Sequence, residues 1–487
     1  MAAGRHAAVV HRARRDEEAA VAESDWRALL ETTQRLATGY LEGLPDRRVG
    51  PTATLAQLRA GLHQPLLDEP VAAVAVIRDL AAAADPGLMA TPSSRFFGFV
   101  IGGAVPASVA ADWLTTAWDQ NAGLYAAAPA AMVAEEVAAG WLTDLLGLPA
   151  SVSTGFVTGC QMANTTGLAA GRHAVLQRAG WDVETRGLAG SPGVRVVVGG
   201  ERHATIDRAL RLLGLGTKQV AVVPADGQGR MRADHLARVL DADDSTPTIV
   251  CAQLGNVNTG ALDPIADIVE LAHRRGAWVH VDGAFGLWAA ASPSLAPLVA
   301  GAEGADSWAT DAHKWLNVPY DSGLVFCADP GAHRAAMGVQ ASYLIHAEHQ
   351  ERDAMDFNPE FSRRARGFPV YAALRSMGRA GVADLVDRCC ALARRFATAL
   401  EAADGVEVCN DVVLNQVLVR FPGRDGDADR RTPVVVRAVQ ADGTCWLSGT
   451  VWQGRPAMRV SVSNWSTTPA DVDRSVAAIL RCAEAAG

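Results

Sequence analysis

Short apolar runs alternate with helical segments over residues 110–330, and this alternation constrains the fold more than any other feature. Four runs rich in β-branched side chains are typical of buried strands: 194–198, 248–252, 278–282 and 323–327. Helical connectors are predicted at 163–177, 265–274 and 295–300. Strands spaced by helices favour an α/β fold with a mostly parallel sheet covered on both faces. In such sheets ligands bind beyond the carboxyl ends of the strands, so functional side chains are expected there.

The flanking regions have different patterns, which predict separate domains. Residues 1–22 are predicted to be a mobile tail and 23–92 an N-terminal helical segment, with periodic stretches at 55–62 and 71–84. Residues 93–375 form the predicted large domain. Residues 376–487 form a predicted small C-terminal α+β domain, with a helix at 382–402, alternating segments at 412–421 and 458–462, and a last helix from Pro469.

Composition excludes several classes of protein. No run of 18 or more uncharged apolar residues is present, so no membrane span is predicted. A formal net charge of −9 argues against a nucleic-acid-binding surface. The first 22 residues lack the apolar core of a signal peptide, and the eight cysteines show no metal-binding spacing. These features favour a cytoplasmic protein with reduced thiols that acts on a small molecule.

An aspartate and a lysine suggest a cofactor. Asp282 closes the apolar run at 278–282, and Lys314 lies in the stretch Asp311-Ala-His-Lys-Trp. The pair fits pyridoxal 5′-phosphate (PLP), with the lysine as a Schiff base and the aspartate as partner of the protonated ring nitrogen. Either residue alone would usually be a surface lysine or a helix-capping aspartate. The remainder of the site therefore decides between these interpretations.

Two further residues suit the faces of a flat cofactor ring. His203 directly follows a predicted strand and could stack on one face, although a lone histidine there is as often an ordinary loop residue. Ala284, two residues after Asp282, would contact the other face, where a larger side chain would collide with the ring.

A phosphate cradle is predicted at residues 158–164, where a turn of small residues opens a helix. His313 could add a phosphate contact, and Asn256 follows a strand at the same sheet edge. The alternative use of the histidines is a metal site within 346–349, but its spacing matches no strong zinc pattern, so no metal is predicted.

At this point the chain resembles a known family, the group II PLP-dependent decarboxylases. This family includes the aromatic-amino-acid, glutamate and histidine decarboxylases and has the aspartate-aminotransferase fold (fold type I). The resemblance runs from Ser93 to Ala478. It is strongest in His280-Val-Asp-Gly-Ala and Asp311-Ala-His-Lys-Trp-Leu-Asn-Val, and shorter matches begin at Arg95, Pro129, Trp141, Ser362 and Arg459.

The resemblance implies a role for several residues. It makes Lys314 the Schiff-base lysine, Asp282 the partner of the ring nitrogen and His203 the stacking histidine. It also implies that Cys160 and Gln161 belong to the phosphate loop.

For the substrate, the resemblance implies that Arg459 holds the carboxylate, as the matching arginine does in some members. It places Tyr343 on a mobile loop that reaches the partner subunit's site in a homodimer and protonates Cα once CO₂ has left.

Three departures from the family pattern concern the site. Ser93-Ser94 stands where the family usually has His-Pro, and Asp311 stands where an asparagine is common. The segment Phe99-Val100-Ile101-Gly102 lacks the expected aromatic pattern. Because Phe99 and Val100 lie in the family's substrate-pocket segment, the pocket is expected to differ from that of aromatic-amino-acid enzymes.

The sequence therefore predicts a PLP-dependent carboxy-lyase that converts an L-amino acid to the corresponding amine and CO₂. The alternatives are an oxidative decarboxylase that yields an aldehyde, an aminotransferase, and an inactive PLP-fold scaffold. Related aldehyde-forming enzymes alter either the stacking histidine or the loop tyrosine, and both are present here as His203 and Tyr343. Intact Lys314 and Asp282 argue against a scaffold.

Overall fold

The computed structural model describes residues 25–339, 352–422 and 426–486. Its contacts divide the chain into two units, Met1–Ser93 and Ser94–Gly487. The predicted mobile tail (1–22) and Tyr343 lie outside the described residues, as does the histidine pair at 346–349.

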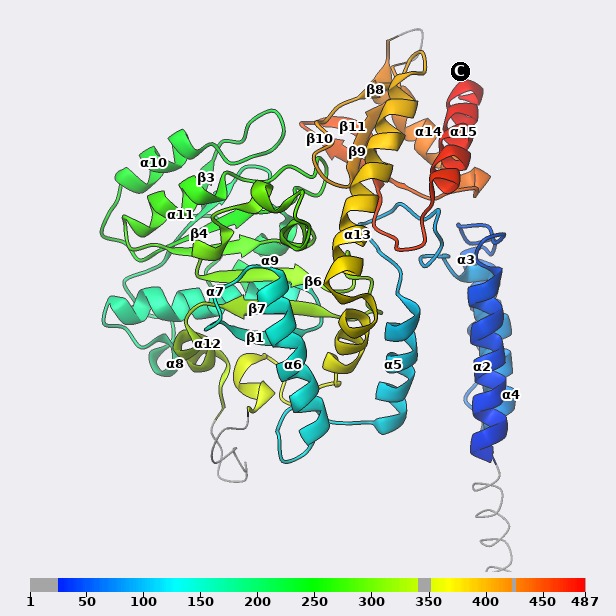
Figure 1. Cartoon of the computed structure of the whole chain (residues 1–487), viewed down its shortest axis with the longest axis horizontal. Helices are drawn as coiled ribbons and strands as arrows, with labels where there is room; N and C mark the ends of the chain where they lie inside the picture. Colours follow the sequence, from blue (N-terminus) through cyan, green and yellow to red (C-terminus); the bar gives the residue numbers. More distant parts are fainter. Residues whose placement is uncertain (1–24, 340–351, 423–425, 487) are drawn as a thin grey trace, which may run out of the picture. The chain divides into compact units, whose positions relative to one another are not determined.

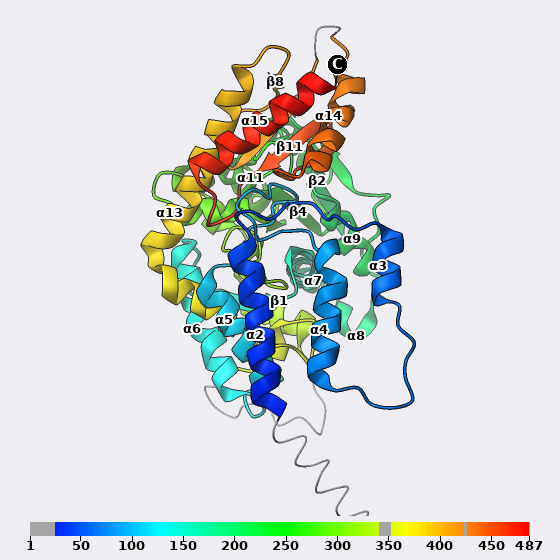
Figure 2. The ribbon, with the colours of Figure 1, turned by 90° about the vertical axis from the view of Figure 1, so that its right-hand side faces the viewer.

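The first unit consists of helices that leave much apolar surface uncovered. It contains α2 (Asp25–Gly43), α3 (Leu55–Leu62), α4 (Ala73–Ala84) and the 3₁₀ turn η1 (Asp85–Gly87) (Figure 2). A capping box between Thr54 and Gln57 starts α3, as the predicted stretch at 55–62 requires. Neither α3 nor α4 has a buried residue, and Trp26 and Leu30 of α2 are 69% and 54% exposed.

The second unit is built around a seven-stranded sheet (Figure 1). Its strands are β1 (Ser153–Val157), β2 (Arg195–Gly199), β3 (Ala221–Val223), β4 (Thr248–Gln253), β5 (Trp278–Asp282), β6 (Ser307–Asp311) and β7 (Gly323–Cys327). They lie in the order β1-β7-β6-β5-β4-β2-β3. Strand β7 is antiparallel to both neighbours and the other pairs are parallel. The predicted mostly parallel sheet is confirmed.

Helices cover both faces of this sheet, as the alternation along β2 illustrates. Val196 and Val198 pack in one cluster with Leu168 and residues of the following helix, whereas Val197 packs in another cluster with Ile268. The helices of this part are α5 (Pro106–Trp118), α6 (Pro129–Leu145), α7 (Cys160–Arg178), α8 (Val183–Arg186), α9 (Ala204–Leu212), α10 (Ala233–Asp241), α11 (Ile265–His273) and α12 (Pro330–Met337). Among them, α7, α10 and α11 contact the strands of the sheet.

The helix predicted at 295–300 is wrong. That region forms only a 3₁₀ turn, η3 (Ala296–Val299), between the similar turns η2 (Gly286–Ala291) and η4 (Ala302–Gly304). The proline at its start disfavours extension of the helix toward the N-terminus. Gly301, which follows the C-cap residue and has φ 92°, ends the helical conformation on the other side.

The C-terminal part forms a second, smaller sheet. Strands β8 (Glu407–Val408), β9 (Gln416–Arg420), β10 (Ser448–Trp452) and β11 (Arg455–Ser461) are antiparallel in the order β10-β11-β9-β8. Helices α14 (Ala428–Asp442) and α15 (Pro469–Ala485) pack together, and α14 lies against β11. Helix α13 (Gly367–Glu401) runs through the predicted domain boundary at 375, with a break at Gly378, and the short turn η5 (Ala354–Phe357) precedes it.

Within the described ranges, no helix has both the length and the apolar character needed to cross a membrane.

Candidate active site

Lys314 and Asp311 form an ion pair at the end of β6. Lys314 Nζ lies 2.7 Å from Asp311 Oδ2, and the aspartate is buried. Burial alone would lower the pKa of Lys314, but the charge and hydrogen bond of Asp311 and the charge of Asp282 outweigh it and raise the pKa above its ordinary value. The lysine is therefore held here as an ammonium group.

The other oxygen of Asp311 faces the start of α7. Oδ1 accepts a hydrogen bond from the main-chain N–H of Cys160 at 2.5 Å and lies 3.3 Å from His313 Nε2. A negative side chain is favourable at a helix N-terminus because the unpaired N–H groups there carry partial positive charge. Asp311 thus links the lysine to the predicted phosphate cradle, a link that the usual asparagine could provide only as a neutral group.

The start of α7 is shaped by the close approach of two glycines. A Cβ on Gly323 would lie 2.4 Å from Gly159 Cα, and one on Gly159 would lie 3.0 Å from His313 Cε1. Gly159 is the residue before the first helical residue, Cys160, which is buried. Burial raises the pKa of the Cys160 thiol, and the neighbouring carboxylates act in the same direction. Unpaired N–H groups at such a helix start suit a phosphate.

Asp282 presents a buried carboxylate oxygen that lacks a partner. At the end of β5, its Oδ1 accepts from Ala284 N at 3.3 Å and from Cys160 Sγ at 3.5 Å. Its Oδ2 is buried and has no hydrogen-bond partner among the described residues. Such an orphaned oxygen is costly unless a ligand supplies a donor. A protonated pyridine nitrogen would be a matching donor.

His203 lies among the charged groups of the site. It caps the N-terminus of α9, where its Nδ1 accepts from Thr205 N at 3.3 Å. Burial lowers the pKa of His203; Asp282 opposes this effect, and Lys314 and Arg459 add to it. The neutral ring is therefore the main form near pH 7.

Ala284 and Asn256 occupy the neighbouring strand ends. Ala284 O accepts from Asp311 N at 2.9 Å, so this residue bridges the ends of β5 and β6. Asn256 is buried, and its amide donates to Glu201 O at 3.1 Å and accepts from the N–H groups of the next turn. Its side chain thus holds the loop that carries His203, and its predicted contact with a cofactor stays a prediction.

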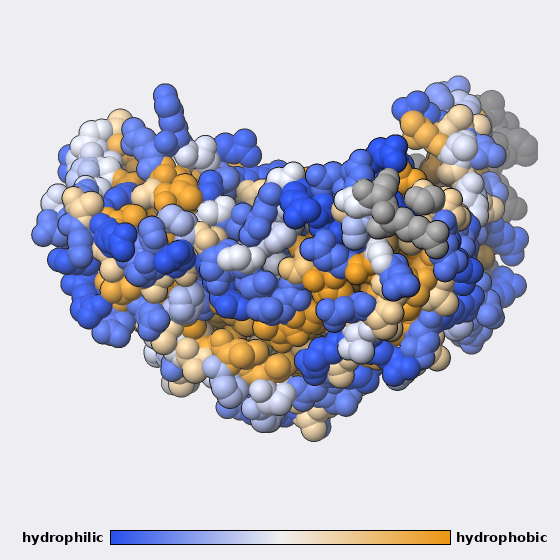
Figure 3. All heavy atoms as spheres, turned by 90° about the horizontal axis from the view of Figure 1, so that it is seen from above, coloured by the Kyte–Doolittle hydropathy of each residue, from blue (hydrophilic) through white to orange (hydrophobic). Residues whose placement is uncertain are grey.

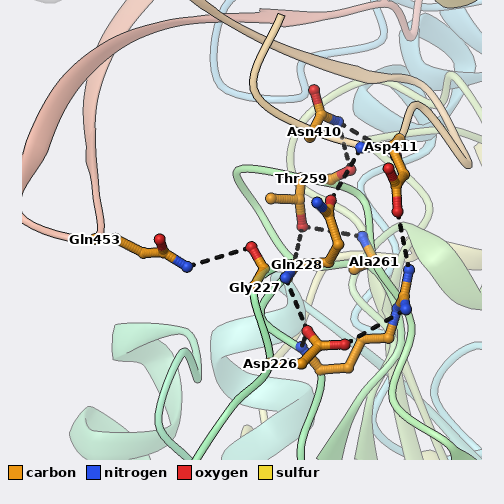
Figure 4. Close-up of polar contacts among 9 residues, drawn as sticks. Asp226, Gly227, Gln228, Thr259, Ala261, Asn410, Asp411 and Gln453 are labelled. Carbon is orange, nitrogen blue, oxygen red and sulfur yellow. Dashed lines mark hydrogen bonds and ion pairs between the residues drawn. The ribbon is translucent and has the colours of Figure 1, made fainter.

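The same turn joins the two sheets (Figure 4). Thr259 Oγ1 donates to Gln228 O at 2.7 Å, and Asn410 Nδ2 donates to Thr259 O at 2.8 Å. Asp411 N donates to Gln228 Oε1 at 3.0 Å, and Gln453 Nε2 donates to Gly227 O at 3.2 Å. These bonds fix the smaller sheet next to the loop of His203.

The predicted substrate segment passes directly over the lysine. A Cβ on Gly102 would lie 1.9 Å from Lys314 O, so only glycine allows this approach. Phe99 and Val100 both have left-handed backbone conformations, with φ 54° and 59°. Val100 is buried, whereas Phe99 is 56% exposed and has its ring 5.3 Å from that of Trp446.

Arg459 is a buried cation without an anion. It lies on β11, and its guanidinium forms no hydrogen bond or ion pair with any of the residues that the structure describes. Burial lowers the pKa of Arg459 to about 10. Its charge also lowers the pKa of His203, so the guanidinium lies within electrostatic reach of that ring.

Some residues of the site escaped sequence reasoning. Tyr320 stacks on His313 with ring centroids 4.2 Å apart, and Trp446 packs against Phe96 and Phe99. An aromatic residue six positions after the lysine was the only available signal for Tyr320. Nothing in the sequence pointed to Trp446, which is far away along the chain.

These features fit PLP: a lysine amine, an orphaned carboxylate oxygen, a neutral imidazole and a helix start. A family model described as the pyridoxal-dependent decarboxylase conserved domain matches residues 56–421. The chain belongs to the pyridoxal-dependent decarboxylase family. The enzyme uses PLP to decarboxylate an amino acid, as predicted.

Similar proteins agree with this assignment. Tryptophan decarboxylase 1 from Oryza sativa subsp. japonica is 28% identical over 80% of each chain. Tyrosine decarboxylase from the same organism is 30% identical, over 73% of this chain and 69% of the relative. The crystal structure of Oryza sativa TDC with PLP and tryptamine superposes with a TM-score of 0.88 at 24% identity, covering 95% of this chain and 98% of the other. The predicted fold type I architecture is confirmed.

Proposed function

We propose that this decarboxylase acts on an L-amino acid with an uncharged side chain and releases the amine and CO₂. The observation that carries the proposal is the buried guanidinium of Arg459, which has no described partner and lies near His203. A substrate carboxylate would supply its missing anion. Residues 99–105, which pass over Lys314, have no charged side chain, so they would favour an uncharged substrate side chain.

On the cofactor side, we assign roles by the chemistry of each group. Lys314 would bind the cofactor covalently, and Asp282 would accept a hydrogen bond from its ring nitrogen. When bound, PLP draws electrons away from the bond that releases CO₂. His203 and Ala284 would contact its two faces.

The phosphate would lie at the start of α7. Cys160 opens the helix there with its own N–H bonded to Asp311, Gln161 would provide a main-chain N–H group, and His313 would add a side chain. Asp311, at the end of β6, would support this arrangement by pairing its charge with the Lys314 ammonium group. Asn256, after the end of β4, would support it by holding the loop before His203.

On the substrate side, Arg459 would orient the carboxylate, and Phe99 and Val100 would contact the side chain. Tyr343 would deliver the proton to Cα after CO₂ has left, which favours an amine over an aldehyde. This proton transfer requires a donor in hydrogen-bond reach of Cα.

We further propose that the enzyme is a cytoplasmic homodimer. Large exposed apolar side chains occur on α2, α4 and α5, among them Trp26, Leu80 and Trp118. On the face shown in Figure 3, hydrophobic residues form patches that are bordered by hydrophilic residues. Apolar patches of this kind favour a second copy of the chain as partner. All eight cysteines are unpaired, which suits a reducing compartment.

A panel of L-amino acids tests the reaction. The PLP-loaded enzyme is incubated with charged, aromatic and aliphatic amino acids, and CO₂, amine, aldehyde and keto acid are measured. We expect equal amounts of amine and CO₂ from an uncharged amino acid. Stoichiometric aldehyde would support the oxidative alternative, and keto acid without CO₂ would support aminotransfer.

Subunit mixing tests the shared site. Lys314→Ala and Tyr343→Phe variants are each expected to form no amine on their own. If Tyr343 acts in the partner's site, mixed dimers regain one complete site and therefore amine formation. Mixtures that stay inactive despite subunit exchange, measured by light scattering and differently tagged chains, would contradict the proposed dimeric site.

A further inference from the structure

The ring of His203 is oriented by a group that can only donate. Its Nδ1 accepts from the main-chain N–H of Thr205 at 3.3 Å. An N–H cannot accept in return, so Nδ1 carries no proton. The hydroxyl of Thr205 lies 2.8 Å from the same nitrogen and must therefore donate to it as well.

This assignment propagates through the next polar groups. Because the Thr205 hydroxyl donates to His203, its oxygen is free to accept from Asn164 Nδ2, 3.2 Å away. The amide oxygen of Asn164 then faces His280 Nε2 at 2.9 Å. An amide oxygen only accepts, so His280 carries its proton on Nε2.

The far end of the chain of hydrogen bonds agrees with this direction. Trp278 Nε1, which can only donate, gives its hydrogen to Ser307 Oγ at 2.9 Å. Because neutral His280 with its proton on Nε2 can only accept at Nδ1, the Ser307 hydroxyl, 2.9 Å away, donates to that nitrogen. Every bond of the chain therefore fits one direction, from Trp278 to His203.

The groups between the ends are enclosed by the protein and fully paired. Asn164, His280 and Ser307 are all fully buried. Burial lowers the pKa of His280 to about 4, so the ring stays neutral at pH 7. A Cβ on Gly167 would lie 2.8 Å from the His280 ring, which shows how closely α7 packs on it. A buried network in which every donor has an acceptor is rigid and holds its members in place.

We propose that Asn164, His280 and Ser307 are positioning residues that hold His203 as the neutral tautomer with its proton on Nε2. Nε2 forms no hydrogen bond with a described residue, so this N–H is free to donate to a ligand. A second proton would have to enter at Nδ1, against the N–H of Thr205.

The charged groups around His203 come from four elements: Asp282 from β5, Asp311 from β6, Lys314 from the turn after it and Arg459 from β11. The carboxylates favour a charged ring and the two cations oppose it. With the network added, His203 donates a hydrogen bond but does not take a proton from the substrate. This consequence rests on the proposed function, whereas the tautomer does not.

The test measures the tautomer directly in the cofactor-free protein. Histidine labelled with ¹⁵N in the ring is incorporated, and the His203 signals are assigned by their loss in His203→Gln. In the wild type we expect a protonated Nε2 and a bare Nδ1 between pH 6 and 8. In Asn164→Asp, the new carboxylate accepts hydrogen bonds from both Thr205 and His280. The Thr205 hydroxyl should then turn away from His203, and the pKa of His203 should rise by about one pH unit.

Two pairs of variants separate hydrogen bonding from packing. Thr205→Val removes the hydroxyl and should also raise the pKa of His203, while Thr205→Ser should keep the wild-type signals. Thr166→Val is the matched control, because Thr166 is buried on the same helix and its hydroxyl has no partner among the described residues. Thermal unfolding confirms that each variant is folded.

The outcomes distinguish the inference from the proposed function. A wild-type His203 protonated on Nδ1 would overturn the inference, as would His203 signals that are unchanged in both Asn164→Asp and Thr205→Val. In the loaded enzyme, these two variants should shift the acidic limb of the pH profile of amine formation upward. A wild type that has the expected tautomer but forms no amine contradicts the proposed function alone.

Discussion

The two sides of the site differ in how completely the protein itself satisfies them. On the cofactor side, which comprises Cys160, His203, Asp282, Asp311 and Lys314, nearly every polar atom has a protein partner. The exceptions among these side chains in the described part of the chain are Asp282 Oδ2, which is buried, and His203 Nε2.

On the substrate side, which comprises residues 99–102 and Arg459, the guanidinium has no described partner. The backbone at Phe99 and Val100 is left-handed. Each left-handed non-glycine residue costs about 1 kcal/mol or more.

This difference separates scaffold from ligand-binding groups. A satisfied polar network keeps its geometry without a ligand, whereas an unsatisfied buried group raises the energy of the free protein and is stabilised on binding. The unpartnered atoms thus mark where ligand charge is expected: a cation at Asp282 Oδ2 and an anion at Arg459. Removing such groups should harm catalysis more than stability, and removing paired groups should do the reverse.

Asp282→Asn should give the largest functional loss. The neutral amide cannot stabilise a protonated ring nitrogen, so kcat should fall by about 10²- to 10³-fold at saturating PLP. The cofactor-free protein should be as stable as the wild type or slightly more stable, because a buried carboxylate oxygen without a partner is removed. Steady-state amine formation and urea unfolding measure the two quantities. A loss of stability above about 2 kcal/mol would place Asp282 with the scaffold instead.

Arg459→Met should raise KM by about 30-fold or more, because the substrate carboxylate loses a buried charge partner. The stability of the free protein should not fall. The matched control is Arg363→Met: Arg363 is equally buried but pairs with Glu135 at 2.7 Å, with both side chains 0% exposed. Breaking that pair should cost about 3–5 kcal/mol. If both substitutions destabilise equally, the contrast between paired and unpaired arginines does not hold.

Asp311→Asn tests the cofactor side through the pH dependence of the free energy of unfolding. The folded-state pKa of Lys314 is raised above its ordinary value of 10.5, so the ion pair stabilises the fold below pH 10.5 and this contribution is lost as the pH rises further. The variant should therefore be less stable by about 1–2 kcal/mol at pH 8, with the difference closing above pH 10.5. Urea unfolding of the cofactor-free proteins at pH 8, 9.5 and 11 measures this.

The same substitution removes a negative charge from the phosphate cradle. PLP should then bind about three- to tenfold more tightly, as measured by fluorescence titration at pH 8. Weaker binding would mean that Asp311 positions the cofactor rather than repels its phosphate.

Sequence patterns predicted the buried strands well where apolar character was continuous. The predicted ranges 278–282 and 323–327 coincide with β5 and β7. The central strand β6 was not predicted, because its residues Ser-Trp-Ala-Thr-Asp mix polar and apolar types. Its serine is buried through the bond to His280, a contact that no local pattern reveals. Helix α14 was also missed, since its valine run favours a strand and only its packing on β11 makes it helical.

The site was predictable to the extent that its residues lie in motifs. Asp282 and His203 were identified from their places at strand ends and Lys314 from the stretch Asp-Ala-His-Lys-Trp, and the structure brings them together. The network behind His203 could not be predicted: Asn164 and His280 both lie in recognised stretches, but they are 116 residues apart and no local pattern shows that they pair. Long-range polar pairing depends on the packed fold, so the sequence indicates the reacting groups better than the groups that orient them.

The smallest effects are expected at Phe99, where backbone and side chain can be separated. Phe99→Ala keeps a left-handed residue without the ring, whereas Phe99→Gly also removes the strain. Because Phe99 is 56% exposed, loss of the ring should cost less than about 1 kcal/mol in either variant, and the glycine variant should be more stable than the alanine variant by about 1 kcal/mol. Val451→Ala, at a comparably exposed position with 63% exposure on β10, is the control.

Both Phe99 variants should change the ratio of kcat/KM between a large and a small substrate by a similar factor, on the order of tenfold. This equality follows if the ring, and not the strained backbone, selects the substrate. If only the glycine variant changes the ratio, the left-handed conformation itself shapes the pocket, and the strain on the substrate side is part of specificity.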